Sequence, residues 1–371
     1  MLRAAIMTFH GSHNFGSVFQ AYALKRKVAQ LGFEAEIINF RPIAQIDKYS
    51  LVPRMYGTKT AIKSLMKATK LGKISRSHQK YEDFIARHLT SSEMFTEMSG
   101  FSELPKYDVY ITGSDQVWGY SIPEFVKASE DIRPAYYCSF TSGKKISYAS
   151  STGEATVCQL EPYADYLSRY SSISVRENMS VDIIKELSGR DAVCCLDPTF
   201  LLSRDDYDAM LRGYRNVVDG EYILLYSLQG MRINKEWLEL AGRASERLGL
   251  PVLSVSPFCT RKSNYVHPIY DAGPLDILNL FSNASYVLTD TFHGTLFSTH
   301  FDRQFMTFEP GRDDPRMRDV LVRLGLADRI VHSVVDGVEL LDHAVDYEFV
   351  SKRRNIEVEN SIRYLEQALK E

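Results

Sequence analysis

The sequence predicts an α/β fold with two Rossmann-like domains that face each other across a cleft. Short apolar runs alternate with amphipathic helical patterns, an order typical of βαβ units and of a mostly parallel sheet. The alternation pauses at a polar, charged segment, residues 203–220, and then restarts. The chain also has 371 residues, more than a single hydrophobic core usually contains. We therefore expect an N-terminal domain over residues 1–202 and a C-terminal domain over residues 203–371.

Six short apolar runs predict the strands of the N-terminal domain. They are RAAIMTF, EAEIINF, YDVYITG, KISYASS, SISVRE and AVCCLD, which begin at residues 3, 34, 107, 145, 172 and 192. A helix should follow the first strand, with Asn14 as its cap and Gly32 at its end. Another helix should run from an N-cap at Ser180 to Gly189.

Residues 44–104 depart from this alternation and predict a helical insertion in the N-terminal domain. From Lys48 to Lys80 there are nine Lys or Arg residues and no acidic residue. Two interpretations stay open for this basic segment. Its cations are either solvated, or they form a basic amphipathic surface that meets an anionic membrane or a phosphorylated acceptor.

The C-terminal domain should repeat the same architecture. Its expected strands are EYILLYSL, PVLSVS, ASYVLTD, RQFMTFE and DRIVHS, which begin at residues 221, 251, 284, 303 and 328. A helix should begin after an N-cap at Asn234, and the last helix should occupy residues 351–371. Ligands of such sheets bind outside the carboxyl ends of the strands, so the loops there are the candidate sites.

The composition excludes several classes of protein. A formal net charge of −3 gives no general attraction to nucleic acid. No apolar run approaches the roughly 18–20 residues of a membrane span, and the N-terminus resembles a first strand rather than a signal peptide. The five cysteines form no CxxC pair, which favours reduced thiols over a metal site. We expect a cytoplasmic protein, at the inner face of the membrane if the basic segment binds lipid.

The loop after the first strand, His10 to Ser17, could bind part of a ligand. Gly16 and Ser17 open a helix there, and free N–H groups at a helix start suit a phosphate or diphosphate. Asn14 should cap this helix in any case, with or without a ligand.

The loop TGSDQVW, residues 112–118, follows another predicted strand. Ser114, Asp115 and Gln116 should project from the edge of the sheet, and Asp115 is a candidate for holding or deprotonating a substrate hydroxyl. Trp118 could stack on a sugar, although a core position is the more common role of a Trp.

Arg176 ends the apolar run of SVRE. A guanidinium fixed at a strand end suits a carboxylate or a phosphate. A surface arrangement of Arg176 with Glu177 is the structural alternative.

The stretch TDTFHG, residues 289–294, leads from a strand into another predicted helix. Asp290, Thr291, His293, Gly294 and Thr295 gather there, and His293 lies near the helix N-terminus. An anion bound at this positive end favours a protonated imidazole, which would make His293 a general acid. A structural His293 bonded to Asp290 is the alternative.

A further patch, EPGRDDPRMRD, carries Arg312 and Arg316 beside two aspartates. These cations could bind an anionic donor, although we expect at least one salt bridge within the patch. The sequence contains no GxGxxG, P-loop, HExxH or GxSxG motif, so no single motif identifies the chemistry.

Taken together, several segments resemble the polysaccharide pyruvyl transferase family. The resemblance runs from about Met7 to about Arg329. Its segments are NFGSVFQAYAL, YDVYITGSDQVW, SYASS, SVRE, LDPTFLL, YVLTDTFHGTLFSTHF and RMRDVLVRLGLADR.

This resemblance implies a GT-B-like fold and transfer of the enolpyruvyl unit of phosphoenolpyruvate to a sugar of a surface polysaccharide or its lipid-linked precursor. The product is a pyruvate ketal, and neither a nicotinamide nor an essential metal is implied. Arg176 would bind phosphoenolpyruvate and His293 would be the general acid. Some members carry an Arg where this chain has Phe292, so Arg312 or Arg316 would supply that contact instead. Asp115 and the loop from His10 would hold the acceptor.

Two other functions stay open. The same scaffold could serve a glycosyltransferase or a nucleotide-sugar epimerase, because a fold does not determine its chemistry. A sugar-binding protein with a degenerate site is the alternative outside enzymes, and Phe292 keeps this alternative open.

Overall fold

The computed structural model describes residues 1–51, 71–122, 130–228, 235–255, 265–309 and 314–371. Contacts between residues divide the chain into two compact units. Unit 1 comprises Met1–Ser64, Glu82–Leu202 and Ile356–Glu371, and unit 2 comprises Leu65–Tyr81 and Ser203–Asn355.

The junction after Leu202 lies where the sequence places it, but two segments are exchanged. Residues 65–81 belong to unit 2 and residues 356–371 to unit 1. The first exchange follows from ion pairs, because Lys80 Nζ lies 2.7 Å from Asp276 Oδ2 in unit 2. The second follows from hydrogen bonds that the last helix makes with unit 1, such as Tyr364 Oη to the carbonyl of Ser147 over 2.9 Å.

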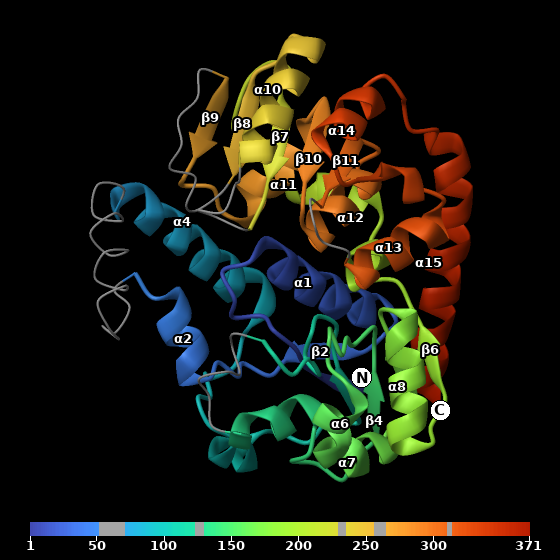
Figure 1. Cartoon of the computed structure of the whole chain (residues 1–371). Helices are drawn as coiled ribbons and strands as arrows, with labels where there is room; N and C mark the ends of the chain where they lie inside the picture. Colours follow the sequence, from blue (N-terminus) through green and yellow to red (C-terminus); the bar gives the residue numbers. More distant parts are fainter. Residues whose placement is uncertain (52–70, 123–129, 229–234, 256–264, 310–313) are drawn as a thin grey trace. The chain divides into compact units, whose positions relative to one another are not determined.

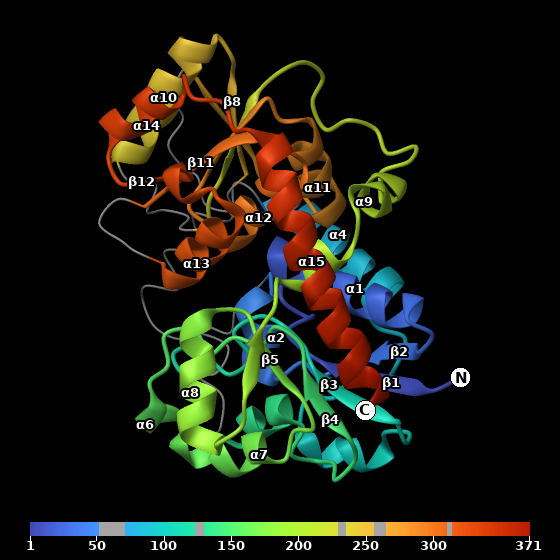
Figure 2. The ribbon, with the colours of Figure 1, turned by 90° about the vertical axis from the view of Figure 1, so that its right-hand side faces the viewer.

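Unit 1 contains a parallel sheet of order β2-β1-β3-β4 (Figure 1), whose four strands are labelled in Figure 2. Its strands are β1 (Arg3–Met7), β2 (Glu34–Ile37), β3 (Val109–Thr112) and β4 (Lys145–Ser147). A second parallel pair, β5 (Ile173–Val175) and β6 (Ala192–Cys194), adjoins β4 through isolated bridges. All six expected strands are therefore present, each shorter than its apolar run.

The helical elements of unit 1 surround this sheet. They are α1 (Phe15–Gln30), α2 (Ile43–Tyr49), η1 (Ile85–Leu89), η2 (Met98–Glu103), η3 (Glu130–Tyr137), α6 (Val157–Leu160), η4 (Glu161–Tyr163), α7 (Ala164–Ser168), α8 (Asn178–Ser188) and η5 (Pro198–Leu201). The expected N-cap of α8 is wrong. Glu177, with extended backbone, occupies that position, and Ser180 lies inside the helix, where its hydroxyl donates to the Glu177 carboxylate at 2.5 Å. The expected end is confirmed, since Gly189 adopts a left-handed conformation with φ 68°.

Aromatic side chains dominate the core of unit 1. Trp118 is 1% exposed and stacks on Tyr137, with the ring centroids 5.7 Å apart. Phe15 and Phe19 on α1 are fully buried. Burying rings of this size stabilises the unit by roughly 1.5–3 kcal/mol each relative to exposure.

Unit 2 contains a six-stranded parallel sheet of order β12-β11-β10-β7-β8-β9. The strands are β7 (Ile223–Tyr226), β8 (Val252–Val255), β9 (Val266–Ile269), β10 (Tyr286–Thr289), β11 (Gln304–Phe308) and β12 (Ile330–Val331). Five of these were expected and β9 was not. Pro268 interrupts its pattern, and such a residue is tolerated because β9 is an edge strand.

Helices cover both faces of this sheet, since every residue of β7 and of β10 is buried. The helical elements are α4 (Leu71–Phe84, in unit 2 as far as Tyr81), α9 (Arg204–Met210), α10 (Lys235–Leu248), α11 (Pro274–Asn283), α12 (Phe292–His300), α13 (Pro315–Leu324), η7 (Ala327–Arg329), α14 (Val334–Leu340) and α15 (Tyr347–Lys370, in unit 2 as far as Asn355, the long helix of Figure 2). Helices α10 and α14 lie side by side (Figures 1 and 2). The expected cap Asn234 lies outside the described residues.

In each sheet the order of the strands extends from one strand in both directions, so the sheet has a point at which the strand order reverses. In unit 1 β2 and β3 lie on opposite sides of β1, and in unit 2 β8 and β10 lie on opposite sides of β7. The crevice at the carboxyl ends of two such strands is the usual ligand site of a doubly wound sheet.

Candidate functional site

The reversal point of unit 2 carries a hydrogen-bonded pair of polar side chains. Ser227 follows β7 and Asp290 follows β10, and the hydroxyl of Ser227 donates to Asp290 Oδ2 over 2.8 Å. Both residues are buried. The pair therefore joins the two strand ends at which a ligand is expected.

The chain then turns from β10 into α12, as the stretch TDTFHG predicts. Thr291 is the N-cap, and its hydroxyl accepts a hydrogen bond from the amide of Gly294 over 2.9 Å. His293 lies in the first turn of α12 and is partly exposed. The helix thus presents the positive end of its dipole and an imidazole at the same edge of the sheet.

Gly294 is required by the close approach of two threonines. A Cβ at this position would lie 2.2 Å from Thr289 Oγ1 and 2.6 Å from Thr291 Oγ1. Thr289 Oγ1 in turn donates to the carbonyl of Tyr226 on β7, over 2.8 Å. The tight turn therefore depends on the absence of a side chain.

Thr295 and Phe292 support this turn from within. Thr295 is fully buried, and its hydroxyl bonds the carbonyl of Thr291 at 3.1 Å and the hydroxyl of Thr307 at 2.8 Å. Phe292 is 8% exposed, with its ring at a right angle to that of His293 and 5.3 Å away. A buried aromatic ring thus occupies the first position of α12.

The patch after β11 contains the expected salt bridge. Arg316 in the first turn of α13 binds Asp314 through two nitrogens, with Nε 2.9 Å from Oδ1. Glu309, which directly follows β11 and is 3% exposed, accepts a hydrogen bond from the amide of Asp314 over 3.3 Å. Arg312 lies outside the described residues.

In unit 1, Arg176 and Asp115 lie together. The Arg176 side chain is 2% exposed and its Nη1 lies 3.1 Å from Asp197 Oδ2. Asp115 and Glu177 also approach it, at 4.0 and 3.8 Å. One guanidinium therefore faces three carboxylates, which fix its position and keep its charge compensated.

Asp115 adopts an unusual backbone conformation, with φ 77°. Such a conformation costs a residue other than Gly roughly 1–3 kcal/mol. Its carboxylate accepts hydrogen bonds from Ser17 Oγ at 2.7 Å and from the amide of Gln116 at 2.9 Å, which offset part of this strain. The side chain is 15% exposed, so it remains in contact with solvent at the reversal point of unit 1.

Two predicted residues of this region are internal. Trp118 donates from Nε1 to the carbonyl of Tyr136 over 3.2 Å and is buried in the core, so it offers no face to a sugar. Ser114 is fully buried, and its hydroxyl lies 2.8 Å from the carbonyl of Ala149 and 3.3 Å from Asp197 Oδ2. Both shape the loop around Asp115.

The polar side chains of the loop that begins at His10 also have hydrogen-bond partners within unit 1. His10 is fully buried, with its ring nitrogens 3.2 Å from the carbonyl of Thr8 and 3.1 Å from Asn39 Oδ1. Burial lowers the pKa of His10 to about 4, so the ring is neutral at pH 7. Asn14 caps α1 as expected, and its side chain accepts the amide of Gly16 over 3.0 Å.

This geometry can be compared with known proteins. Residues 14–312 match the family described as polysaccharide pyruvyl transferase, well over half of the chain. The chain belongs to the polysaccharide pyruvyl transferase family. No curated protein sequence matches it significantly.

Solved structures share the fold at low sequence identity. A UDP-GlcNAc 2-epimerase from Methanocaldococcus jannaschii, in complex with UDP-GlcNAc and UDP, has a TM-score of 0.53 and 13% identity over 93% of each chain. UDP-N-acetylglucosamine 2-epimerase from Rickettsia bellii has a TM-score of 0.52 and 9% identity over 98% of each chain. Likeness at such identity shows the fold alone, which is GT-B-like with two Rossmann-like units. A mutant O-GlcNAc transferase from Thermobaculum terrenum aligns over 98% of this chain but 63% of its own, at 11% identity and TM-score 0.46.

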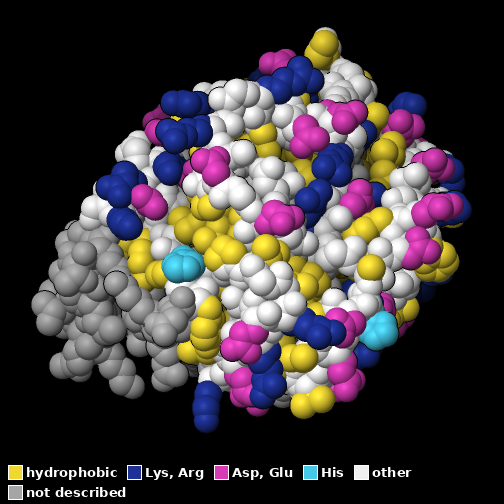
Figure 3. Space-filling model, turned by 90° about the horizontal axis from the view of Figure 1, so that it is seen from above, with side chains coloured by type: hydrophobic (Ala, Val, Ile, Leu, Met, Phe, Trp, Pro, Cys, Tyr) yellow, Lys and Arg dark blue, Asp and Glu magenta, His cyan; other side chains and the backbone are white. Residues whose placement is uncertain are grey.

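The surface charge and the state of the cysteines in this pyruvyl transferase family member match what its composition indicates. Basic and acidic side chains are interspersed over the face shown in Figure 3, so neither sign dominates it. The four cysteines in the described ranges are thiols; they are Cys138, Cys158, Cys194 and Cys195. Within the same ranges, no helix has the length and apolar character needed to cross a bilayer.

Sequence reasoning missed three polar residues of the two sites, Ser227, Glu309 and Asp197. Ser227 and Glu309 directly follow β7 and β11, and Asp197 is the third residue after β6. The carboxyl end of each strand is the signal that could have found them. Without knowledge of which strands are neighbours, such residues cannot be separated from ordinary loop residues.

Proposed function

We propose that this member of the family transfers the enolpyruvyl group of phosphoenolpyruvate to a sugar of a bacterial-type surface polysaccharide, or of its lipid-linked precursor, and forms a pyruvate ketal. The observation that carries the proposal is the family match over residues 14–312. The start of α12, with Thr291 as its cap and His293 in its first turn, supports the donor end.

The proposed donor is a small trianion. The N-terminal turn of α12 offers positive potential to it through the dipole of the helix. Gly294 lets the chain make this turn, and the buried hydroxyl of Thr295 fixes it. Arg316 and Arg312 are the proposed cations of this unit. Arg176 of unit 1 already pairs with three carboxylates, so its proposed role toward phosphoenolpyruvate rests on the family resemblance alone.

His293 is the proposed general acid. It would deliver a proton to the methylene carbon of the enol phosphate while a sugar hydroxyl forms a bond to the adjacent carbon. Phosphate then leaves with the C–O bonding electrons, and a second hydroxyl of the sugar closes the ketal. A well-placed acid accounts for about 10²–10⁴-fold in rate, and stabilisation of the developing charge must supply more.

Asp115 is the proposed contact for the acceptor hydroxyl. It is partly exposed and is held by Ser17. A carboxylate in this state can accept the hydrogen bond of a sugar hydroxyl and take its proton as the C–O bond forms. Gln116, next to it, would contribute a second polar contact.

A lipid-diphosphate carrier would place the reaction at the cytoplasmic face of the membrane. The basic segment Lys48–Lys80 is the proposed contact with anionic headgroups. Arg76 and Lys80 already pair with Asp271 and Asp276 in unit 2, so the other cations of the segment would have to provide this contact.

The direct test is incubation of the protein with phosphoenolpyruvate and a panel of carrier-linked glycans. The proposal predicts release of phosphate and a gain in mass of one glycan, both without an added cofactor and in the presence of EDTA. Turnover of a nucleotide sugar without use of phosphoenolpyruvate would instead identify a glycosyltransferase or an epimerase. Binding of a glycan with no turnover of either donor would identify a degenerate site.

A further inference from the structure

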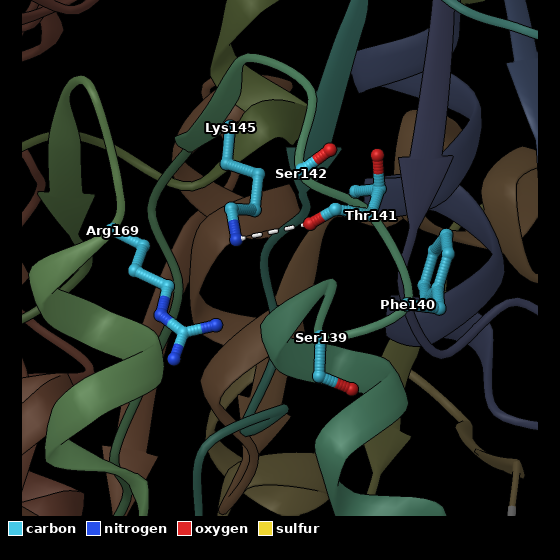
Figure 4. Close-up of a pocket in the computed structure, with 6 residues that line it drawn as sticks. All are labelled: Ser139, Phe140, Thr141, Ser142, Lys145 and Arg169. Carbon is cyan, nitrogen blue, oxygen red and sulfur yellow. Dashed lines mark hydrogen bonds between the residues drawn. The ribbon is translucent and has the colours of Figure 1, made fainter.

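Unit 1 contains a cavity of about 400 Å³ at the amino-terminal edge of its sheet (Figure 4). It is lined by Ser139, Phe140, Thr141, Ser142, Lys145 and Arg169. Lys145 is the first residue of β4, whereas Asp115 and Arg176 follow the carboxyl ends of β3 and β5. Because these strands are parallel and each residue advances about 3.3 Å, the cavity and the candidate site of unit 1 lie at opposite edges of the sheet.

Two cationic side chains line the cavity from different elements. Lys145 comes from β4 and Arg169 from the end of α7, and Figure 4 shows their nitrogen atoms directed toward the same space. Lys145 is 3% exposed, and its ammonium donates to the carbonyl of Thr141 over 3.3 Å. Among the described residues, the carbonyl of Thr141 is the one hydrogen-bond acceptor of the Lys145 ammonium, although this ammonium carries three N–H groups.

The surroundings leave an excess of positive charge in the cavity. Asp165 acts electrostatically on Lys145, but its exposed carboxylate already pairs with Arg169. Burial raises the pKa of the Cys138 thiol to about 11, so this neighbour is neutral and does not compensate Lys145. Burial also lowers the pKa of Lys145, a cost that a bound anion would remove.

We propose that this cavity binds the phosphate group of a small phosphorylated molecule, at a site separate from the one that would bind phosphoenolpyruvate. Lys145 supplies a buried point charge, and Arg169 supplies a planar fork that matches phosphate oxygens. A volume of about 400 Å³ exceeds that of a bare ion and lies in the usual range of ligand pockets. The remainder of the ligand would lie beside the ring of Phe140, which also lines the cavity.

The test uses the whole protein with inorganic phosphate and phenyl phosphate as probes. Crystals soaked with each probe should show tetrahedral density within hydrogen-bond distance of Lys145 Nζ and the Arg169 guanidinium. Binding measured by calorimetry should weaken by about tenfold or more in Lys145→Met and in Arg169→Gln, because each loses a charge-assisted hydrogen bond. Lys185→Met is the matched control, since Lys185 is an exposed lysine of the same unit that pairs with Asp191.

Each outcome decides the proposal. Density that is present in the wild type and in Lys185→Met, but absent in Lys145→Met, supports it. An empty cavity in the soaked wild type, or density that persists in Lys145→Met, overturns it. Arg169→Gln keeps the test valid if Lys145→Met fails to fold, because Arg169 is exposed. Tighter binding of phenyl phosphate identifies a phosphate ester as the ligand, whereas binding of inorganic phosphate alone contradicts that assignment.

Discussion

Ser227 and Asp290 join the carboxyl ends of two neighbouring strands, through a hydrogen bond of 2.8 Å between the hydroxyl and the carboxylate. Strands β7 and β10 are the pair at which the sheet of unit 2 reverses its order. Directly after Asp290 the chain enters α12 and presents His293. The bond therefore anchors the loop that carries the proposed general acid.

Gly294→Ala should destabilise unit 2 strongly. The added methyl group would lie 2.2 Å from Thr289 Oγ1, and neither this threonine nor Thr291 can withdraw without losing a hydrogen bond. We expect a loss of roughly 1–3 kcal/mol or more, the usual cost of overpacking. Thermal and urea unfolding measure it. Gly72→Ala in α4 is the control, because its Cβ would meet only Arg76 Nη1 at 3.9 Å; a similar loss in both variants would contradict the account.

A comparison of Asp115→Asn with Asp115→Ala should separate the effect of the strained backbone on stability from the effect of the carboxylate on activity. Asn tolerates the left-handed conformation of Asp115 better than Ala does. Asp115→Asn should therefore unfold closer to the wild type than Asp115→Ala, while both lose most of the transferase activity. Urea unfolding and initial rates test this expectation. Full activity in Asp115→Asn would exclude the carboxylate from the reaction.

His300 should make the stability of the protein depend on pH. Burial lowers the pKa of His300 to about 3, from an ordinary value of 6.5. As the pH falls below 6.5 the unfolded chain binds a proton that the folded chain refuses, so stability decreases toward pH 3, by up to about 1.4 kcal/mol per pH unit. His300→Phe should flatten this part of a urea-unfolding series, since Tyr207 and Phe301 already surround the site.

The exposed His343 provides the matched control for this series. His343→Phe should keep the slope of the wild type between pH 6.5 and pH 4. An unchanged slope in His300→Phe would show that other groups cause the acid sensitivity, and His10, with its lowered pKa, would be the next residue to examine.

Neutralising the basic segment should weaken association with anionic vesicles if the acceptor is carried by a lipid. Flotation with vesicles that contain phosphatidylglycerol measures the bound fraction, and added salt should reduce it further. The variant replaces Lys59, Lys63, Lys67 and Lys70 by Gln, all outside the described residues. The control replaces four exposed lysines elsewhere, Lys185, Lys235, Lys352 and Lys370. Equal binding by the two variants and the wild type would end the membrane proposal.

The sequence predicted the strands well where an apolar run ends in a turn, as in β10, where Thr291 and Gly294 give a cap and a tight turn. It failed at β9, because Pro268 is compatible with a strand only at the edge of a sheet, and the position of a strand in a sheet is not local information.

The candidate site was predictable only in part, for a related reason. Asp115 and Arg176 were recognised singly, but the approach of Arg176 to both Asp115 and Asp197 depends on three segments of the chain meeting at one edge. The burial of Trp118 was equally hidden, since its neighbours Tyr137 and Tyr170 come from distant positions. Local patterns identify strand ends; they do not identify which side chains fill the space between them.

The central claim is that His293 protonates the methylene carbon of phosphoenolpyruvate during transfer to a sugar. The most direct measurement is the reaction in D₂O with an accepted carrier-linked glycan, analysed by mass spectrometry of the product. The account predicts a ketal whose methyl group carries one solvent deuterium, and a rate that falls by about 10²–10⁴-fold in His293→Gln while glycan binding is retained. Formation of the same ketal by His293→Gln at the wild-type rate, or a ketal without solvent deuterium, would contradict it.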